Sequence, residues 1–188
     1  CQPKILSYTN KEFFEYAGAA GGFLDKWGYP FCRGRIFNTL EKDENQYDNS
    51  SEIFWASGAC LAIKSDIFHA LGGFDERFFA HMEEIDLCWR IQNSGYTIAF
   101  VPDSTVYHLG GGTLNKSNPQ KTFLNHRNSL AMIFKNLPTN LVFQRIFIRL
   151  LLDGVSAIKL VFAGKLKDCF AILKAHFSFY AMIPYLIR

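Results

Sequence analysis

Residues 71–91 read LGGFDERFFAHMEEIDLCWRI, and the second half of this segment has the apolar spacing of an amphipathic helix. We predict that this helix covers 83–93 and that Gly95 ends it. Three acidic residues fall in its first turn, namely Glu83, Glu84 and Asp86. The dipole and the N–H groups of a helix start stabilise carboxylates, so we expect these side chains to be ionised at neutral pH.

This acidic cluster has two interpretations on the residues alone. An ionised carboxylate held at a helix start is what a general base requires, and Glu84 fits that role. Asp86 and Arg90 lie four positions apart, so they can pair along the helix and orient its first turn without involving Glu84. The alternative is that the carboxylates only cap the helix and take no part in catalysis.

The segments on either side alternate apolar runs with glycine, proline and polar breakers, which predicts an α/β fold. The predicted elements are strands over 53–63, 96–101 and 105–108 and helices over 66–71 and 119–135. A Pro-Asp turn separates the last two strands. Residues 18–50 are rich in glycine and polar side chains, so we expect a long loop region with short elements there.

His108 ends the last of these strands and is followed by three glycines at 110–112. The glycines allow the backbone to bend sharply or to approach a ligand closely. An imidazole in such a place can bind a divalent metal or contact a phosphate, although a structural histidine is the alternative. The glycines alone do not form a phosphate-binding loop, because no predicted helix follows them directly.

The chain has 188 residues, of which 49% are hydrophobic and 20% charged, as in a globular protein with a core. Its charge is uneven: residues 1–133 carry 12 Lys+Arg and 15 Asp+Glu (−3), whereas residues 134–188 carry 8 and 2 (+6). A basic, apolar tail indicates an anionic partner, and without nucleic-acid-binding motifs we favour a membrane over nucleic acid. Five scattered cysteines without a CxxC pair indicate reduced thiols.

After Pro138 the chain becomes strongly apolar. Arg145, Arg149 and Asp153 are spaced by four and form one narrow polar stripe. No stretch reaches the roughly 20 uncharged apolar residues that a membrane-spanning helix needs. We therefore expect amphipathic helices that lie in a membrane interface, and the alternative is that these helices only pack on the body of the protein.

Taken together, these motifs resemble the acceptor-side half of family 2 glycosyltransferases with the GT-A fold, closest to rhamnosyltransferase-like bacterial members. The motifs are GACLAIK at 58–64, the segment at 71–91, VP at 101–102 and VYH at 106–108. The resemblance covers 53–113 and continues through NHRN at 125–128 to about residue 136. The expected architecture is the C-terminal half of a GT-A domain over 1–136, followed by amphipathic helices over 137–188.

The resemblance also implies roles for individual residues. In such enzymes one carboxylate of an acidic pair is the base, which here is Glu84 in a place usually held by aspartate, with Glu83 as the alternative. His108 matches a position that completes metal coordination in some relatives. The residues expected at the donor-sugar and acceptor site are Trp55, Ser57, Gly58, Ala59, Asp75, Asp86 and Arg90.

The activity implied is inverting transfer from a nucleotide-diphosphate sugar to a glycan or lipid-linked acceptor in cell-surface polysaccharide synthesis, with Mg²⁺ or Mn²⁺. The family's nucleotide-binding half carries a DxD metal motif, and no Asp-x-Asp occurs in this sequence. We therefore expect the other metal ligands upstream of Cys1, and this chain alone to be inactive. The expected location is cytoplasmic, peripheral on the inner face of the plasma membrane. The alternative is a non-catalytic carbohydrate-binding or membrane-surface scaffold module.

Overall fold

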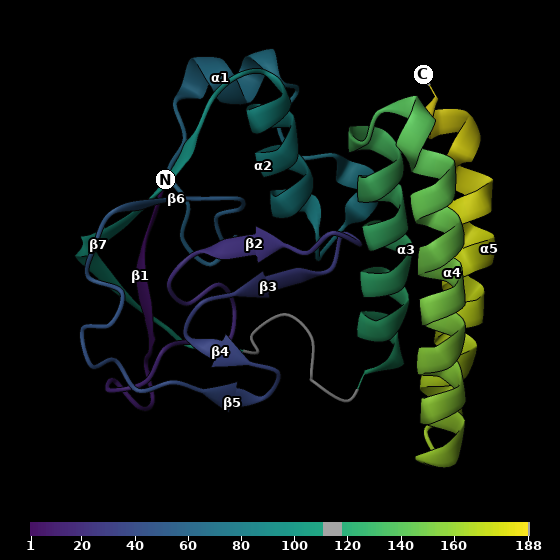
Figure 1. The fold of residues 1–188 in the computed structure, drawn as a ribbon, viewed down its shortest axis with the longest axis horizontal. Coiled ribbons are helices and arrows are strands. Elements are labelled where there is room, and N and C mark those ends of the chain that lie inside the picture. Colours follow the sequence, from purple (N-terminus) through teal and green to yellow (C-terminus); the bar gives the residue numbers. More distant parts are fainter. Residues whose placement is uncertain (111–117, 188) are drawn as a thin grey trace. The chain divides into compact units, whose positions relative to one another are not determined.

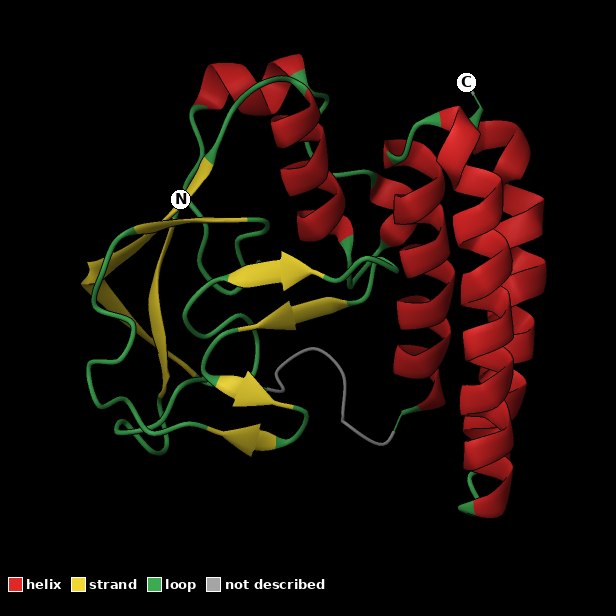
Figure 2. Cartoon of the chain, viewed as in Figure 1, coloured by secondary structure: helices red, strands yellow, loops and turns green. Residues whose placement is uncertain are grey.

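A computed structural model describes residues 1–110 and 118–187, and these residues form two compact units. The first unit comprises Cys1–Asp75 and Glu84–Gly112, and the second comprises Glu76–Glu83 and Thr113–Arg188. Strands and short helices make up the first unit, and long helices make up most of the second (Figure 1, Figure 2). The mixed α/β composition agrees with the prediction. The division differs from the predicted boundary at residue 136, because the helix that begins at residue 119 packs with the tail helices.

A three-stranded sheet organises the first unit. It contains β1 (Gln2–Ser7), β7 (Ile98–His108) and β6 (Ser51–Ile53), in the order β1-β7-β6. β1 runs parallel to β7, and β6 runs antiparallel to it. Sequence reasoning did not anticipate β1, although its Ile5 and Leu6 are buried in the core.

β7 is one strand where we predicted two. Val101 pairs with Pro3 and Thr105 pairs with Lys4, so residues 102–104 have no partner in β1. The Pro-Asp pair therefore forms a bulge within the strand and not a turn between strands. Proline cannot donate to a strand ladder, and a bulge is where a sheet accommodates it.

The strand predicted over 53–63 is mostly absent, because β6 covers only the first of these positions. Beyond β6 the buried backbone finds its partners one at a time. The N–H of Phe54 donates to the carbonyl oxygen of Gly22 at 2.8 Å, and the N–H of Ser57 donates to Oε1 of Gln2 at 2.7 Å. The predicted burial holds only for the first part of the segment, at Ile53 and residues 55–57. The N–H groups of Phe54 and Trp55 both donate to Gly22, whereas later N–H groups bond other segments, so the strand does not continue.

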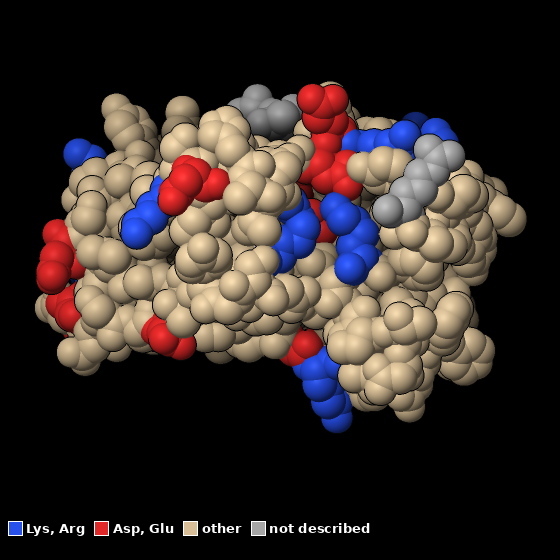
Figure 3. All heavy atoms as spheres, turned by 90° about the horizontal axis from the view of Figure 1, so that it is seen from above, with Lys and Arg blue, Asp and Glu red and all other residues tan. Residues whose placement is uncertain are grey.

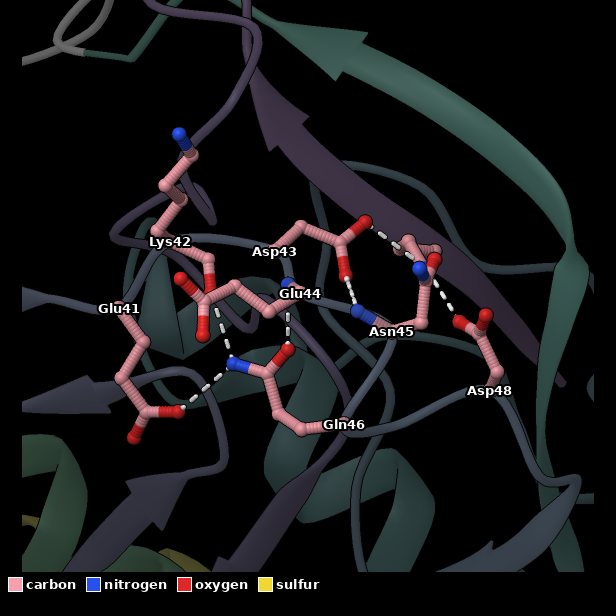
Figure 4. Close-up of polar contacts among 8 residues, drawn as sticks. Glu41, Lys42, Asp43, Glu44, Asn45, Gln46 and Asp48 are labelled. Carbon is pink, nitrogen blue, oxygen red and sulfur yellow. Dashed lines mark hydrogen bonds and ion pairs between the residues drawn. The ribbon is translucent and has the colours of Figure 1, made fainter.

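Two short hairpins occupy the region predicted as a long loop with short elements. The first joins β2 (Gly22–Leu24) to β3 (Pro30–Cys32), and the second joins β4 (Arg35–Ile36) to β5 (Thr39–Leu40). The next segment, residues 41–48, is acidic and lies over β1 (Figure 4). Its sequence is polar throughout, so it needs a specific anchor to stay in place.

Lys4 of β1 is that anchor. Its Nζ lies 2.9 Å from Oδ2 of Asp43 and 2.6 Å from Oδ1 of Asp48, as the dashed lines of Figure 4 show for these carboxylates. Burial by itself would lower the pKa of Lys4, but the bonds to Asp48 and Asp43 outweigh it and raise that pKa. A buried ammonium with two carboxylates thus holds the acidic segment against the sheet.

Three helices form most of the second unit: α3 (Pro119–Asn136), α4 (Thr139–Phe162) and α5 (Leu166–Leu186). The side chain of Asn118 caps α3 by accepting the N–H of Gln120 at 2.9 Å, and Pro119 stands at the first helical position, where proline is favoured. α3 ends just before Leu137 and Pro138, as predicted. The three helices pack on one another pairwise.

The interior of this bundle is polar at its centre. Arg149 and Asp153 of α4 are buried, so the narrow polar stripe faces inward. Oδ2 of Asp153 lies 3.0 Å from Nδ1 of His126 on α3 and 3.1 Å from Nε2 of His176 on α5. Arg149 donates to Oγ of Ser129 at 2.8 Å. One carboxylate therefore connects all three helices.

Asp153→Asn should destabilise the bundle and flatten its pH dependence. Burial would raise the pKa of Asp153, but the bonds from His126 and His176 and the charge of Arg149 outweigh it and lower that pKa. A pKa below the unfolded value of about 3.9 gives stability that is complete above that value and is lost as pH falls below it. Denaturant unfolding at pH 7 should show a loss of about 3 kcal/mol for the variant.

The same measurement repeated between pH 5 and pH 3 supplies the control, since the wild-type protein should lose stability over this range and the variant should lose less. Equal slopes for the two proteins would contradict the assignment of Asp153 as the connecting ion.

Candidate active site

The acidic helix is present as predicted. α2 spans Glu83–Asn93, and α1 (Ser65–Ala70) covers the predicted short helix with a shift of one residue. Glu84, the predicted base, is half-buried in the first turn of α2. A Cβ built at Gly58 would lie 3.9 Å from the side-chain carbons of Glu84, which is ordinary contact distance. The structure thus brings Glu84 and the small-residue segment together.

Residues 57–59 form a turn next to Glu84. Oγ of Ser57 donates to the carbonyl oxygen of Ala17 and accepts the N–H of Ala59 at 3.1 Å. The hydroxyl of Ser57 is therefore occupied within the protein, and Ser57 itself is buried. Gly58, which is exposed, places bare backbone beside the carboxylate. A bound hydroxyl can approach a carboxylate more closely over glycine than over any other residue.

Glu83 departs from one prediction. Burial raises the pKa of its carboxyl group, whereas we expected the helix start to keep it ionised. Its Oε2 is buried and accepts no hydrogen bond within the described part of the chain. The cost of desolvation outweighs the benefit of the helix start here. Glu83 consequently stays a candidate for the base, because a base works best with a pKa nearer the operating pH.

Asp86 and Arg90 are not placed to bind a substrate, contrary to the prediction. Asp86 is fully buried, and its Oδ2 lies 3.0 Å from Nε and 2.9 Å from Nη2 of Arg90. The same guanidinium donates to the carbonyl oxygens of Leu71 and Gly73. The pair therefore holds the Gly-Gly turn against α2. The i, i+4 spacing predicted the ion pair correctly but not its burial.

Trp55 is also a correction. Its ring is buried, its Nε1 donates to the carbonyl oxygen of Phe23 at 2.9 Å, and a Cβ at Gly22 would overlap the indole. It belongs to the core and does not offer a face to a sugar. Asp75, by contrast, is half-buried just after the Gly-Gly turn. It stays a substrate-binding candidate.

His108 ends β7 as predicted, and it has a neighbour that the sequence did not suggest. Its Nδ1 lies 3.4 Å from Oε2 of the buried Glu15. A Cβ at Gly110 would meet Oε1 of Glu15 at 2.5 Å, so glycine at this position makes room for the carboxylate. The only signal for Glu15 was a single charge among apolar and small residues in FFEYAGAAGG. The glycines at 111–112 lie outside the described residues.

Within the second unit, residues 76–83 lead into α2, and we refer to them as the strap. Phe79, His81 and Met82 have φ angles of 64°, 68° and 72°, a conformation that side chains other than glycine rarely adopt. Such strain persists only where the surroundings enforce it, and it gathers at functional sites. Nothing in the local sequence predicted this backbone conformation.

Two residues of α3 enforce the shape of the strap. Nδ2 of Asn128 lies 2.9 Å from the carbonyl oxygens of Phe78 and Ala80 and 2.8 Å from that of His81. Nη2 of Arg127 donates to the carbonyl oxygen of Phe78 at 3.2 Å and to another strap carbonyl. Both belong to the NHRN motif, whose resemblance to the family carried no assigned role.

Whether a divalent metal fits this site depends on the donor groups that the site offers. Within residues 1–110 and 118–187, no three His, Cys, Asp or Glu side chains converge as a metal site would require. His108 fits as a single ligand, since a carboxylate beside one ring nitrogen is the usual support for a histidine that binds metal through the other. The predicted divalent metal therefore needs ligands from elsewhere.

A cavity of about 500 Å³ in the first unit is a different feature. Its walls are mostly apolar, and they include Ile63, Ile67, Ile91 and Tyr96. None of the predicted site residues lines it, and Cys88 beside it has a pKa raised to about 11 by burial. Among the described residues, no aspartate, glutamate or histidine lines this cavity, so it is separate from the candidate active site.

Comparison with known proteins gives the class first: several curated proteins that match part of this chain are glycosyltransferases. One is the N-acetylglucosaminyl-diphospho-decaprenol L-rhamnosyltransferase of Mycobacterium tuberculosis, 34% identical over 79 residues, which cover 42% of this chain and 26% of that protein. Another is the rhamnosyltransferase WbbL of Escherichia coli, 30% identical over 96 residues, 50% of this chain and 36% of that protein. No protein-family model matches the chain.

These similarities support a glycosyltransferase related to the rhamnosyltransferases. The matched segments span only about a quarter to a third of each relative's length.

Asn128→Ala should loosen the strap and lower activity at the same time. The variant leaves three carbonyl oxygens without their shared donor, which should cost about 2 kcal/mol in denaturant unfolding. In the full-length enzyme kcat should fall, because the start of α2 follows the strap directly. Asn125→Ala on the same helix is the matched control. A stable but inactive Asn128→Ala would instead indicate direct substrate contact, and full activity would remove the strap from the site.

Proposed function

We propose that this chain supplies the acceptor side of an inverting glycosyltransferase, with Glu84 as the general base. One observation carries the proposal: Glu84 stands at the start of α2, 3.9 Å from where a Cβ at the exposed Gly58 would lie, so a carboxylate borders bare backbone. The similarity to rhamnosyltransferases supports sugar transfer as the reaction. The buried state of Trp55 weakens the carbohydrate-binding alternative, because that alternative depended on an accessible aromatic face.

In this mechanism the donor is a nucleotide-diphosphate sugar. Glu84 accepts the proton of an acceptor hydroxyl while that oxygen attacks the anomeric carbon from the face opposite the nucleotide. The new bond forms between the acceptor oxygen and the anomeric carbon, and the bond from that carbon to the diphosphate oxygen breaks. The leaving nucleotide diphosphate takes the bonding electrons, and the configuration at the sugar inverts.

A bound Mg²⁺ or Mn²⁺ would neutralise charge on the leaving diphosphate. His108 would contribute one ligand, and the carboxylate of Glu15, 3.4 Å from Nδ1, would support its ring. The remaining ligands would come from a nucleotide-binding half outside this chain. The residues of this chain therefore serve the acceptor and the leaving group, and GT-A remains the fold that we propose for the complete domain.

We further propose that the acceptor is a glycan on a lipid carrier. The name of the Mycobacterium tuberculosis relative includes a diphospho-decaprenol acceptor, which is consistent with this class of substrate. The +6 charge of residues 134–188 agrees with work at an anionic surface. The proposed location is accordingly the cytoplasmic face of the plasma membrane, and the proposed process is the synthesis of a cell-surface polysaccharide.

Glu84→Gln should lower kcat of the full-length enzyme by about 10²-fold or more, because the amide cannot accept the proton. The donor KM should change little, since the substitution preserves size. Steady-state kinetics with the lipid-linked acceptor measures both. Glu83→Gln is the matched neighbour: loss of turnover in that variant alone would identify Glu83 as the base. Normal turnover in both variants would refute base catalysis by this pair.

His108→Ala should raise the Mg²⁺ or Mn²⁺ concentration required for half-maximal activity. Glu15→Gln should shift it in the same direction by less, because the ring keeps its ligand atom but loses its orienting carboxylate. The ¹⁵N shifts of the His108 ring report its tautomer independently of activity, and they should change in Glu15→Gln. An unchanged metal requirement for His108→Ala would leave this residue with a structural role.

A further inference from the structure

The outer side of α4 carries a continuous row of exposed apolar side chains. They recur every three or four positions, as residues on one face of a helix do. The row consists of Phe143, Phe147, Leu151, Val155, Ile158 and Phe162. Phe147 is 62% exposed and Phe162 is 88% exposed. From first to last the row is about 28 Å long at 1.5 Å per residue.

α5 has a second row of the same kind. Its exposed apolar residues are Leu166, Phe170, Leu173, Phe177 and Tyr180, again three or four positions apart. Phe177 is 73% exposed. α4 and α5 pack against each other, so the protein carries two apolar rows on adjoining helices. Figure 3 views these helices end-on, so it shows their ends and not the rows along their sides. We call the two rows together the outer face.

In the middle of α4 the charged side chains face inward and the apolar row faces outward. Between residues 146 and 158 the charged side chains are Arg149 and Asp153, and both are buried. A water-soluble helix puts its apolar side toward the core and its charges toward solvent. Helices in contact with lipid do the reverse, because charged groups there must face the protein interior and be paired. The occupant of the outer face is therefore apolar.

Charge indicates which apolar partner fits. Lys159, Lys165 and Lys167 are exposed around the turn between α4 and α5, at one end of the outer face. Further along α5, Nζ of Lys174 lies over the ring of Phe123 on α3, 5.2 Å from the centroid. An apolar face with lysines at its border matches the boundary between acyl chains and anionic headgroups.

The orientation follows from the packing of α5. In the described part of the chain, Leu166–Leu186 is the one helix that could cross a membrane by its length and composition, although it contains charged residues. However, Ala171 and Ala175 of α5 share a buried cluster with Phe123 and Leu124 of α3. A crossing α5 would draw α3 into the hydrocarbon, and α3 carries lysine, arginine and histidine side chains. Helices lying along the surface avoid this cost.

We propose that the outer face is a lipid-binding surface that lies in the headgroup boundary of an anionic membrane, with α4 and α5 parallel to the membrane plane. This proposal rests on the proposed location of the enzyme at the membrane and identifies the surface that contacts the lipid. The surface itself depends on no catalytic residue, so it can be tested separately from sugar transfer.

The test uses full-length protein and sedimentation with vesicles of phosphatidylcholine containing phosphatidylglycerol. Wild-type protein should bind and be partly released by high salt, because salt screens the lysines but not the apolar contacts. The double variant Phe147→Glu, Val155→Glu should bind at least about tenfold more weakly. Both residues are exposed, so its thermal unfolding should match the wild type. Phe37→Glu is the matched control, since Phe37 is also an exposed apolar residue but lies in the first unit.

Three results would overturn the proposal. The first is equal vesicle binding by the wild type and the double variant. The second is absence of vesicle binding together with a dimer in sedimentation velocity that the double variant dissociates, which would make a second copy the occupant. The third is deep quenching of a Leu173→Trp variant by lipids brominated near the acyl-chain ends, which would show that α5 crosses the bilayer.

Failure of the proposed transfer reaction gives a different pattern. Glu84→Gln should bind vesicles like the wild type while losing turnover. The double variant should keep its turnover on a short, water-soluble acceptor analogue. A loss of transfer activity in every variant and in the wild type would reject the enzymatic proposal and leave the lipid-binding surface intact.

Discussion

The amide of Asn128 controls the backbone that leads into the acidic helix. Its two N–H groups serve three carbonyl oxygens, those of Phe78, Ala80 and His81, and one of them must be shared. Around these carbonyls, Phe79, His81 and Met82 hold positive φ angles, each of which costs free energy in a side-chain-bearing residue. Without a buried donor at this point, the strap would relax. The shape of the backbone directly before the candidate base is therefore a consequence of hydrogen bonds made from α3.

A second constraint runs through the helical unit. The carboxylate of Asp153 contacts His126 and His176, so one side chain connects three helices. These contacts require the charged side of α4 to face the interior. Once the charges are inside, the aromatic side has to face outward. The exposed phenylalanines and the buried carboxylate therefore follow from the same orientation of α4. This is why the narrow polar stripe in the sequence, which could have marked a solvent-facing edge, marks the core instead.

The elements that the sequence predicted well are those with strong local signals. α2 begins and ends where the acidic first turn and Gly95 place it, and α3 follows its proline and asparagine cap. The failures come from contacts between distant segments. Trp55 is in the core because Gly22, thirty-three residues earlier, leaves room for its ring. Glu15 meets His108 only because β1 and β7 are neighbours in the sheet. No periodicity within one segment contains such information.

The bulge in β7 determines which way His108 points. Three residues, 102–104, have no partner in β1, after which the pairing resumes and places His108 opposite Ser7. Side chains alternate between the two faces of a strand, so an odd number of extra residues reverses the alternation. Removing or adding one residue in the bulge would turn His108 away from Glu15. The strands could still pair by hydrogen bonds on either side of the bulge. The number of unpaired residues in the bulge therefore determines which face of the sheet carries the side chain of His108.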